Sequence, residues 1–139
     1  MNDEAPCLLD AVHIPIQDYA DVAEAGRNAL LFAEACGFSK VLAYYIATAV
    51  IELGNNIMAH ADSDGSIVLT SQFEDTRIVI EIIAEDRGPG IFDVDLALTD
   101  GYTTNNGLGC GLPGVARLMD ELHIETSDQG TRIRARKRR

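Results

Sequence analysis

The spacing of hydrophobic positions predicts two long helices in the first half of the chain. Over 18–36, apolar residues recur at three- and four-residue intervals, with Asp18 placed to cap the start and Gly37 to end the helix. A second, longer helix is expected over 39–61, with Ser39 as its cap. The defining apolar positions are Val22, Ala25, Ala29, Leu30 and Ala33 in the first helix, and Leu42, Ile46, Ala49, Val50, Leu53 and Ile57 in the second.

The rest of the chain has the shorter patterns of strands and turns. An edge strand is expected within 8–16, before the first helix, and β-branched runs separated by short polar turns indicate two hairpins. This order predicts an α+β fold in which helices pack on one face of a mostly antiparallel sheet, because the regular alternation of a doubly wound fold is missing. The remaining expected elements are strands over 66–73 and 77–85, a weak helix over 93–98, a glycine-containing loop over 99–111, a helix over 113–121, and strands over 123–127 and 131–137.

Length and composition place the chain among small globular proteins. Its 139 residues suggest one domain over 1–139, and 47% hydrophobic with 24% charged residues is a globular composition. No uninterrupted apolar run reaches the roughly 18 residues of a membrane-spanning helix, and the acidic N-terminus does not resemble a secretory signal. The three cysteines have no CxxC spacing, so neither a disulfide framework nor a zinc site is expected, and a reducing cytoplasm is the natural compartment.

The net charge of −11 is distributed unevenly along the chain. An acidic surface argues against non-specific binding of nucleic acid. Six of the eleven basic residues nevertheless lie within 132–139, in the last expected strand and just after it. Two interpretations stay open for this segment: a solvated strand end, or a docking patch for an acidic partner or a phosphate.

The second expected helix carries a polar row that packing does not require. Thr48, Glu52, Asn56 and His60 follow one another at four-residue steps, so they lie on one side of the helix, with neighbouring Cβ atoms about 6 Å apart. A carboxylate can accept a proton from a hydroxyl or a water, and an amide oxygen suits Mg²⁺. The alternative is a polar row that faces solvent, in which His60 is an ordinary surface or core histidine.

Two glycine-rich segments could approach a ligand closely. Asp86, Gly88 and Gly90 follow directly after an expected strand, where the carboxylate could accept a hydrogen bond from an exocyclic amine. Residues 107–114 precede an expected helix, and such a backbone can form a nest of N–H donors for phosphate. This second segment fits GxGxxG but follows a polar loop instead of a strand, so a dinucleotide fingerprint is rejected, and no P-loop motif occurs. An ordinary turn and a flexible loop are the alternatives.

Taken together, the three segments resemble the ATP site of the GHKL (Bergerat) superfamily. Residues 52–56 (Glu-Leu-Gly-Asn-Asn) match its N box, residues 86–90 its G1 box and residues 107–111 its G2 box. The pair Gly130-Thr131 matches the threonine that the family places beside adenine. The resemblance implies a two-layer α/β sandwich, with ATP and Mg²⁺ as cofactors.

The resemblance also implies roles for individual residues. Glu52 would be the catalytic base, Asn56 the Mg²⁺ ligand, and 93–106 a lid over the nucleotide. The implied ATP-binding residues are Asn56, Asp86, Gly88, Gly90, Ile91, Gly107, Leu108, Gly109, Gly111, Leu112 and Thr131.

Within the superfamily, the chain is most similar to the RsbT-type serine/threonine kinases of the stressosome, through the string at 111–121 and the short segment between the G1 and G2 boxes. That resemblance implies phosphorylation of STAS-domain proteins of the RsbS and RsbR type and, after release, activation of a PP2C-type phosphatase of the RsbU type. The similarity to histidine kinases is weaker at Arg87, where they usually carry Asn. Two alternatives remain: an anti-sigma-factor kinase of the RsbW or SpoIIAB type, and a non-catalytic module gated by nucleotide.

Overall fold

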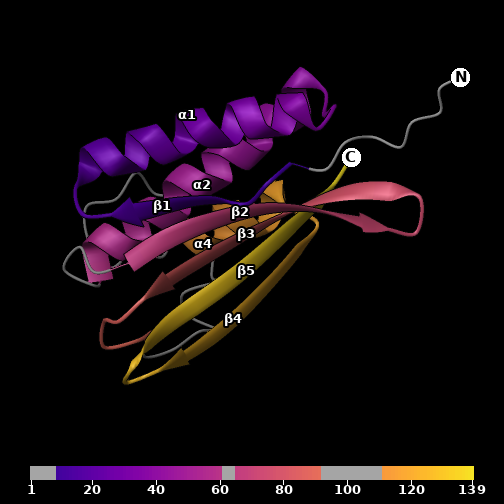
Figure 1. Ribbon diagram of the computed structural model, residues 1–139. Helices are drawn as coiled ribbons and strands as arrows, with labels where there is room; N and C mark the ends of the chain where they lie inside the picture. Colours follow the sequence, from indigo (N-terminus) through magenta and orange to yellow (C-terminus); the bar gives the residue numbers. More distant parts are fainter. Residues whose placement is uncertain (1–8, 61–64, 92–110) are drawn as a thin grey trace, which may run out of the picture.

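A five-stranded antiparallel sheet, covered on one face by helices, forms the protein (Figure 1). The computed structural model describes residues 9–60, 65–91 and 111–139. The strand order is β1-β2-β3-β5-β4, which confirms the predicted α+β sandwich with helices on one face. In chain order the elements are β1 (Val12–Ile16), α1 (Tyr19–Ala35), α2 (Lys40–His60), β2 (Gly65–Glu74), β3 (Arg77–Asp86), α4 (Gly111–Leu118), β4 (Glu121–Ser127) and β5 (Gly130–Arg138).

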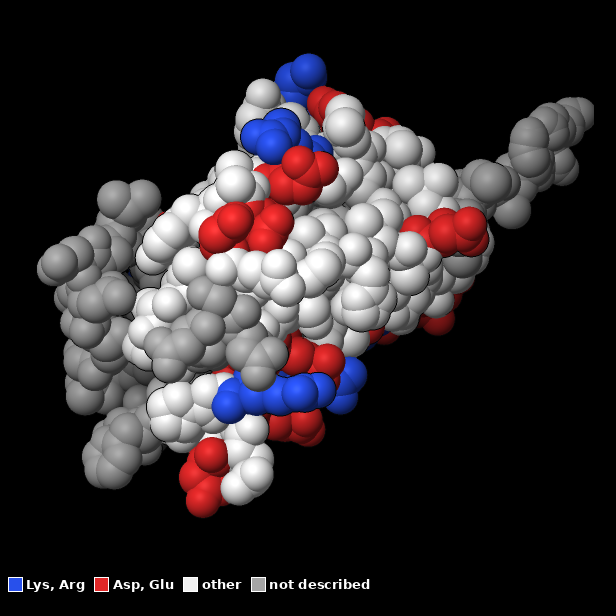
Figure 2. All heavy atoms as spheres, turned by 60° about the vertical axis from the view of Figure 1, so that its left-hand side comes forward, with Lys and Arg blue, Asp and Glu red and all other residues white. Residues whose placement is uncertain are grey.

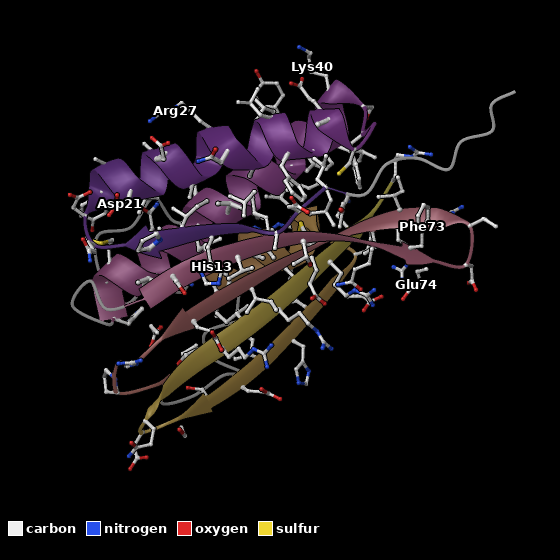
Figure 3. The ribbon with its side chains drawn as sticks, in the orientation of Figure 1. His13, Asp21, Arg27, Lys40, Phe73 and Glu74 are labelled. Carbon is white, nitrogen blue, oxygen red and sulfur yellow. The ribbon has the colours of Figure 1, made fainter. Side chains whose placement is uncertain are left out.

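Helix α1 begins and ends where the sequence predicts. The Asp18 carboxylate accepts a hydrogen bond from the Asp21 amide at 2.9 Å, and the Asp21 carboxylate accepts from the Asp18 amide at 3.3 Å, which forms a capping box. Figure 3 shows Asp21 at this first turn. The helix is followed by Gly37 at φ +87°, the backbone conformation that the predicted stop requires.

Helix α2 is the central helix of the core. The Ser39 hydroxyl accepts a hydrogen bond from the Leu42 amide at 3.2 Å, which confirms the predicted cap. By length and apolar composition α2 would qualify as a membrane-crossing helix. Its apolar side chains are instead divided among α1, α4 and the sheet, which contact it from three directions. This packing explains why so apolar a helix belongs to a globular core.

The two faces of the sheet differ sharply in composition. On the face that the helices cover, alternate strand positions are apolar and buried, among them Ile67, Leu69, Ile80 and Ile82. On the outer face, glutamates and arginines stand opposite one another. Arg132 lies 3.3 Å from Glu85, and Arg138 lies 3.1 Å from Glu74.

The basic C-terminal strand is therefore paired with acidic neighbours. Arg134 and Arg136 each lie 3.7 Å from Glu81, and Arg136 also lies 3.0 Å from Glu74 and 3.5 Å from Glu121. Figure 3 shows Glu74 near the turn that joins β2 to β3, and in the view of Figure 2 basic groups lie against acidic ones. These ion pairs favour the interpretation of a solvated strand over a free basic docking patch.

Both hairpins are confirmed, but the helix predicted over 113–121 is placed wrongly at both ends. Helix α4 covers Gly111–Leu118, and Glu121 is the first residue of β4. The reason is a pairing that lies outside the local pattern: the Asp120 amide donates to the Arg136 carbonyl at 2.9 Å, which draws this segment into the sheet. The helix predicted over 93–98 and the loop over 99–110 lie outside the described residues, whereas Gly111 belongs to α4.

Candidate functional site

Asp86 ends β3 on the side of the sheet that faces the helices. It stands opposite Thr131 of β5, which in turn stands opposite Thr126 of β4, so three polar side chains end three adjacent strands. The Asp86 Oδ1 atom accepts a hydrogen bond from the Gly88 amide at 2.9 Å. Its second oxygen makes no hydrogen bond within the described part of the chain and is available to accept one from a ligand.

Two glycines allow the turn after β3 to lie directly against the β4–β5 hairpin. A Cβ atom on Gly90, whose φ is +88°, would lie 2.1 Å from the Ser127 carbonyl oxygen. A Cβ atom on Gly130 would lie 2.2 Å from the Asp86 carbonyl oxygen. The sequence interpretation ascribed Gly90 to the close approach of a ligand. The structure shows that Gly90 and Gly130 are required by close approach of protein backbone.

Thr126 is a residue of this cluster that the sequence analysis missed. Its hydroxyl oxygen accepts a hydrogen bond from the Ile91 amide at 2.8 Å and lies 2.8 Å from the hydroxyl oxygen of Thr131. A signal was present in the sequence: a tight hairpin turn over 128–129 places Thr126 directly opposite Thr131. The contact with Ile91 carries no local signal, because it joins residues 35 positions apart.

Glu52 lies on α2 and is only 8% exposed. Its carboxylate makes no hydrogen bond or ion pair with any other residue in the described ranges. The alternative that the polar row faces solvent is therefore wrong for Glu52. Thr48, in the same row, is exposed and agrees with that alternative. A poorly exposed glutamate whose carboxylate is not used by the surrounding fold is a candidate for chemistry instead of packing. Asn56, one turn further, is half-buried.

The second half of α2 lies next to the strand end that carries Asp86. Gly65, which stands opposite Asp86 in the β2–β3 ladder, packs so closely on α2 that a Cβ there would lie 2.7 Å from the Ile57 side chain. Helix α2 also contacts α4, which begins at Gly111 and buries Leu112. The N-box helix, the G1 strand end and the start of α4 are thus neighbours. Gly107, Leu108 and Gly109 lie outside the described residues.

A groove of about 660 Å³ borders the same strand ends. It touches Asp86 and Thr131, but side chains of the outer face, such as Glu85, Glu125 and Arg132, make up much of its wall. Because successive side chains on a strand point to opposite faces, this groove approaches Asp86 from the side away from α2. Neither Glu52 nor Asn56 is among the residues that line it.

A model of the histidine kinase-like ATPase domain matches residues 17–137. The chain belongs to this ATPase family. The serine/threonine-protein kinase RsbT of Bacillus subtilis (strain 168) is 40% identical over 119 residues, which cover 85% of this chain and 86% of that protein. The anti-sigma F factor of Caldanaerobacter subterraneus subsp. tengcongensis is 37% identical over 98 residues, 66% of this chain and 67% of its own length.

Solved structures of this ATPase fold agree with the strand and helix arrangement. A chain with the RsbU and RsbW domains of a Mycobacterium tuberculosis protein has a TM-score of 0.63 at 18% identity, covering 94% of this chain and 33% of that chain. The SiaB–SiaC complex of Pseudomonas aeruginosa has a TM-score of 0.60 at 16% identity, covering 95% and 89%. At such identities these likenesses concern the fold alone.

Proposed function

We propose that this chain is an ATP-dependent protein serine/threonine kinase of the RsbT type, formed by one domain over 1–139 and acting in the cytoplasm. The observation that carries the proposal is Glu52, a residue only 8% exposed whose carboxylate has no partner among the described residues, on a helix that also packs beside the Asp86 strand end. The 40% identity to RsbT over most of both chains supports the same reading.

The adenine end of the site is formed by Asp86 and its neighbours. The free oxygen of Asp86 accepts the exocyclic amine, Thr131 contacts the ring from the adjacent strand, and Gly88, Gly90 and Ile91 complete the wall. Backbone N–H groups near a helix start suit phosphate oxygens. In this proposal, the phosphates are bound by Gly107, Leu108, Gly109, Gly111 and Leu112.

Asn56 fits a magnesium ion because a half-buried amide oxygen, one helical turn from Glu52, is the kind of neutral hard ligand that Mg²⁺ accepts alongside phosphates and water. When bound, Mg²⁺ neutralises charge on the phosphates. We expect Asn56→Ala to lose at least about tenfold in nucleotide affinity when Mg²⁺ is present and to change little without it. Titration calorimetry with and without Mg²⁺ measures this, and Asn55→Ala, an equally half-buried neighbour, is the control.

Glu52 acts as the general base in this proposal. Its carboxylate accepts the proton of the acceptor serine or threonine hydroxyl, while the acceptor oxygen attacks the γ-phosphorus and the bond to the bridging oxygen of ADP breaks. Phosphoryl transfer depends mainly on positioning and charge neutralisation, so a small domain can carry it out. The carboxylate suits the role because no donor among the described residues competes for its oxygens.

The proposed substrates are STAS-domain proteins of the RsbS and RsbR type, and the proposed partner after release is a PP2C-type phosphatase of the RsbU type. Both follow from the similarity to RsbT. An anti-sigma-factor kinase of the RsbW or SpoIIAB type is the second candidate, since several anti-sigma F factors are 34–37% identical over 98 residues. The RsbT match extends over more of the chain, 119 residues, which favours the first.

Transfer of radiolabelled γ-phosphate from Mg-ATP to purified STAS proteins tests the kinase proposal, with mass mapping of the acceptor residue. Label on a serine or threonine of the STAS protein is the expected result. Nucleotide binding without any phosphate transfer would favour a non-catalytic module gated by nucleotide. Capture of a sigma factor in place of the phosphatase would favour the anti-sigma-factor kinase.

A further inference from the structure

Three groups at the adenine end form a continuous hydrogen-bonded series. The Ile91 amide donates to the Thr126 hydroxyl at 2.8 Å, and the Thr126 hydroxyl lies 2.8 Å from that of Thr131. Thr131 is 7% exposed and stands opposite Asp86 in the sheet. The series therefore runs from the backbone of the turn after β3 to Thr131, the side chain that the proposed site assigns to the base.

We propose that Thr126 is a positioning residue that fixes the direction of the Thr131 hydroxyl and thereby selects adenine over guanine. The inference rests on the proposed nucleotide site and adds to it a residue for which neither sequence motifs nor the proposed site gives a role. It assigns Thr126 a hydrogen-bonding task although its hydroxyl does not contact the base.

Either hydroxyl could donate in the contact between Thr126 and Thr131, and we assign the donor role to Thr126 because of its bond with Ile91. A threonine hydroxyl has one proton to donate and two lone pairs that can accept. The Ile91 amide can only donate, so it occupies a lone pair of the Thr126 oxygen. Accepting that bond polarises the Thr126 O–H and strengthens it as a donor toward Thr131. With Thr126 as the donor, the Thr131 oxygen accepts this bond, and the proton of Thr131 is left to donate to a ligand.

This direction matches adenine and opposes guanine. Adenine presents an amine beside a ring nitrogen that accepts, whereas guanine presents a carbonyl oxygen beside a ring N–H that donates. The free oxygen of Asp86 accepts the amine, and the proton of Thr131 meets the accepting ring nitrogen. With guanine, the Asp86 oxygen would face a carbonyl oxygen and the Thr131 proton would face an N–H group, so both contacts would be lost.

The first test compares ADP and GDP affinities by titration calorimetry, which requires no turnover. We expect Thr126→Val to bind ADP about tenfold more weakly, the effect of losing roughly one buried hydrogen bond, and to show a smaller preference for ADP over GDP. Thr126→Ser keeps the hydroxyl and should restore both values to within about twofold. The matched control is Thr70→Val, because Thr70 is a half-buried threonine on β2 whose hydroxyl has one 3.4 Å contact, with Gln72.

The second test follows the Ile91 amide by hydrogen exchange in nucleotide-free protein. The exchange rate of this amide should be at least several-fold higher in Thr126→Val than in the unmodified protein. In Thr126→Ser and Thr70→Val the amide should stay protected. If the valine variant does not fold, Thr126→Ala, which also removes the hydroxyl, is measured instead.

The outcomes separate the two proposals. Failure of the unmodified protein to bind ADP would overturn the nucleotide site and this inference with it. Tight ADP binding by the unmodified protein, with an unchanged ADP-to-GDP ratio in Thr126→Val, would overturn only the role of Thr126. A smaller preference for ADP over GDP in Thr126→Val, together with a normal preference in Thr126→Ser, would support the role of Thr126.

Discussion

The two faces of the sheet use polar residues in opposite ways. On the outer face, glutamates and arginines are paired with one another, as in the contacts of Arg136 with Glu74 and Glu81. On the helix side, Glu52 has no partner among the described residues and Asp86 has one oxygen free. The difference teaches that charge content alone does not identify a site. What matters is whether the charged group has already found its partner in the fold.

The strongest test of this contrast is a pair of glutamates, one on each side of the sheet. Glu52→Gln should keep nucleotide affinity and lose phosphotransfer by about 10²- to 10⁴-fold, because the amide cannot accept the acceptor proton. Glu81→Gln, on the outer face with a side chain 13% exposed, should leave the transfer rate within about twofold and lower stability instead.

Both variants are measured by initial rates of γ-phosphate transfer and by ADP titration. Transfer by Glu52→Gln at the rate of the unmodified protein would remove Glu52 from the base role. A comparable loss of rate in Glu81→Gln would remove the distinction between the two faces.

The next test compares two consecutive carboxylates that point to opposite faces. Asp86→Asn should weaken ADP binding by about 10- to 100-fold, since a charged acceptor for the amine becomes a neutral amide. Glu85→Gln alters an exposed residue that pairs with Arg132 at 3.3 Å on the outer face, and ADP affinity should stay within about twofold. Calorimetric titration measures the ADP affinity of both variants. Equal losses of affinity in the two variants would contradict the assignment of Asp86 to the adenine site.

Much of the fold was predictable because the local signals agree with the tertiary structure. Helix α1 has both an apolar stripe and a capping box, and the two hairpins have turn residues between β-branched runs. The end of α4 was not predictable, because Asp120 leaves the helical pattern to pair with Arg136, a contact between residues distant in sequence. Local spacing contains no information about such a partner.

The same limit applies to the candidate site. Glu52, Asp86 and Thr131 could be selected from the sequence because a motif surrounds each of them. Thr126 was harder to select, because the hairpin turn indicates only that it stands opposite Thr131, whereas its contact with the Ile91 amide joins residues 35 positions apart. The glycines of the G1 turn were recognised, yet the group that Gly90 approaches, the Ser127 carbonyl, follows only from the three-dimensional packing.

The outer face should contribute to stability through Arg136, which contacts three glutamates and is 16% exposed in its side chain. Arg136→Gln should lower the free energy of unfolding by about 1–3 kcal/mol, because it removes one of the two guanidinium groups that lie 3.7 Å from the poorly exposed Glu81. Arg132→Gln, with one exposed pair, should cost less than about 1 kcal/mol. Urea denaturation measures both, and ADP affinity should be unchanged in each. A larger loss in Arg132→Gln would contradict this ranking.

The smallest expected effect is the acid response of Glu121. The hydrogen bond from the Arg138 guanidinium, opposed by desolvation, lowers the pKa of Glu121 below its ordinary value of 4.5. A carboxyl whose pKa is lower in the folded state binds fewer protons there than in the unfolded chain at the same pH. Its stabilising contribution is therefore complete above pH 4.5 and is lost as the pH falls through the folded pKa.

Glu121→Gln should accordingly show a shallower decline of the urea midpoint below pH 4.5 than the unmodified protein, and the difference should shrink in high salt because Glu121 is exposed and Arg138 is partly exposed. Glu125→Gln is the control on the same strand, because that carboxylate lies 3.6 Å from His123 and contacts no arginine within the described residues. Parallel pH profiles for Glu121→Gln and the unmodified protein would contradict the coupling of Glu121 to Arg138. The ion pairs of the outer face would then stabilise the sheet only through contacts less exposed than this one.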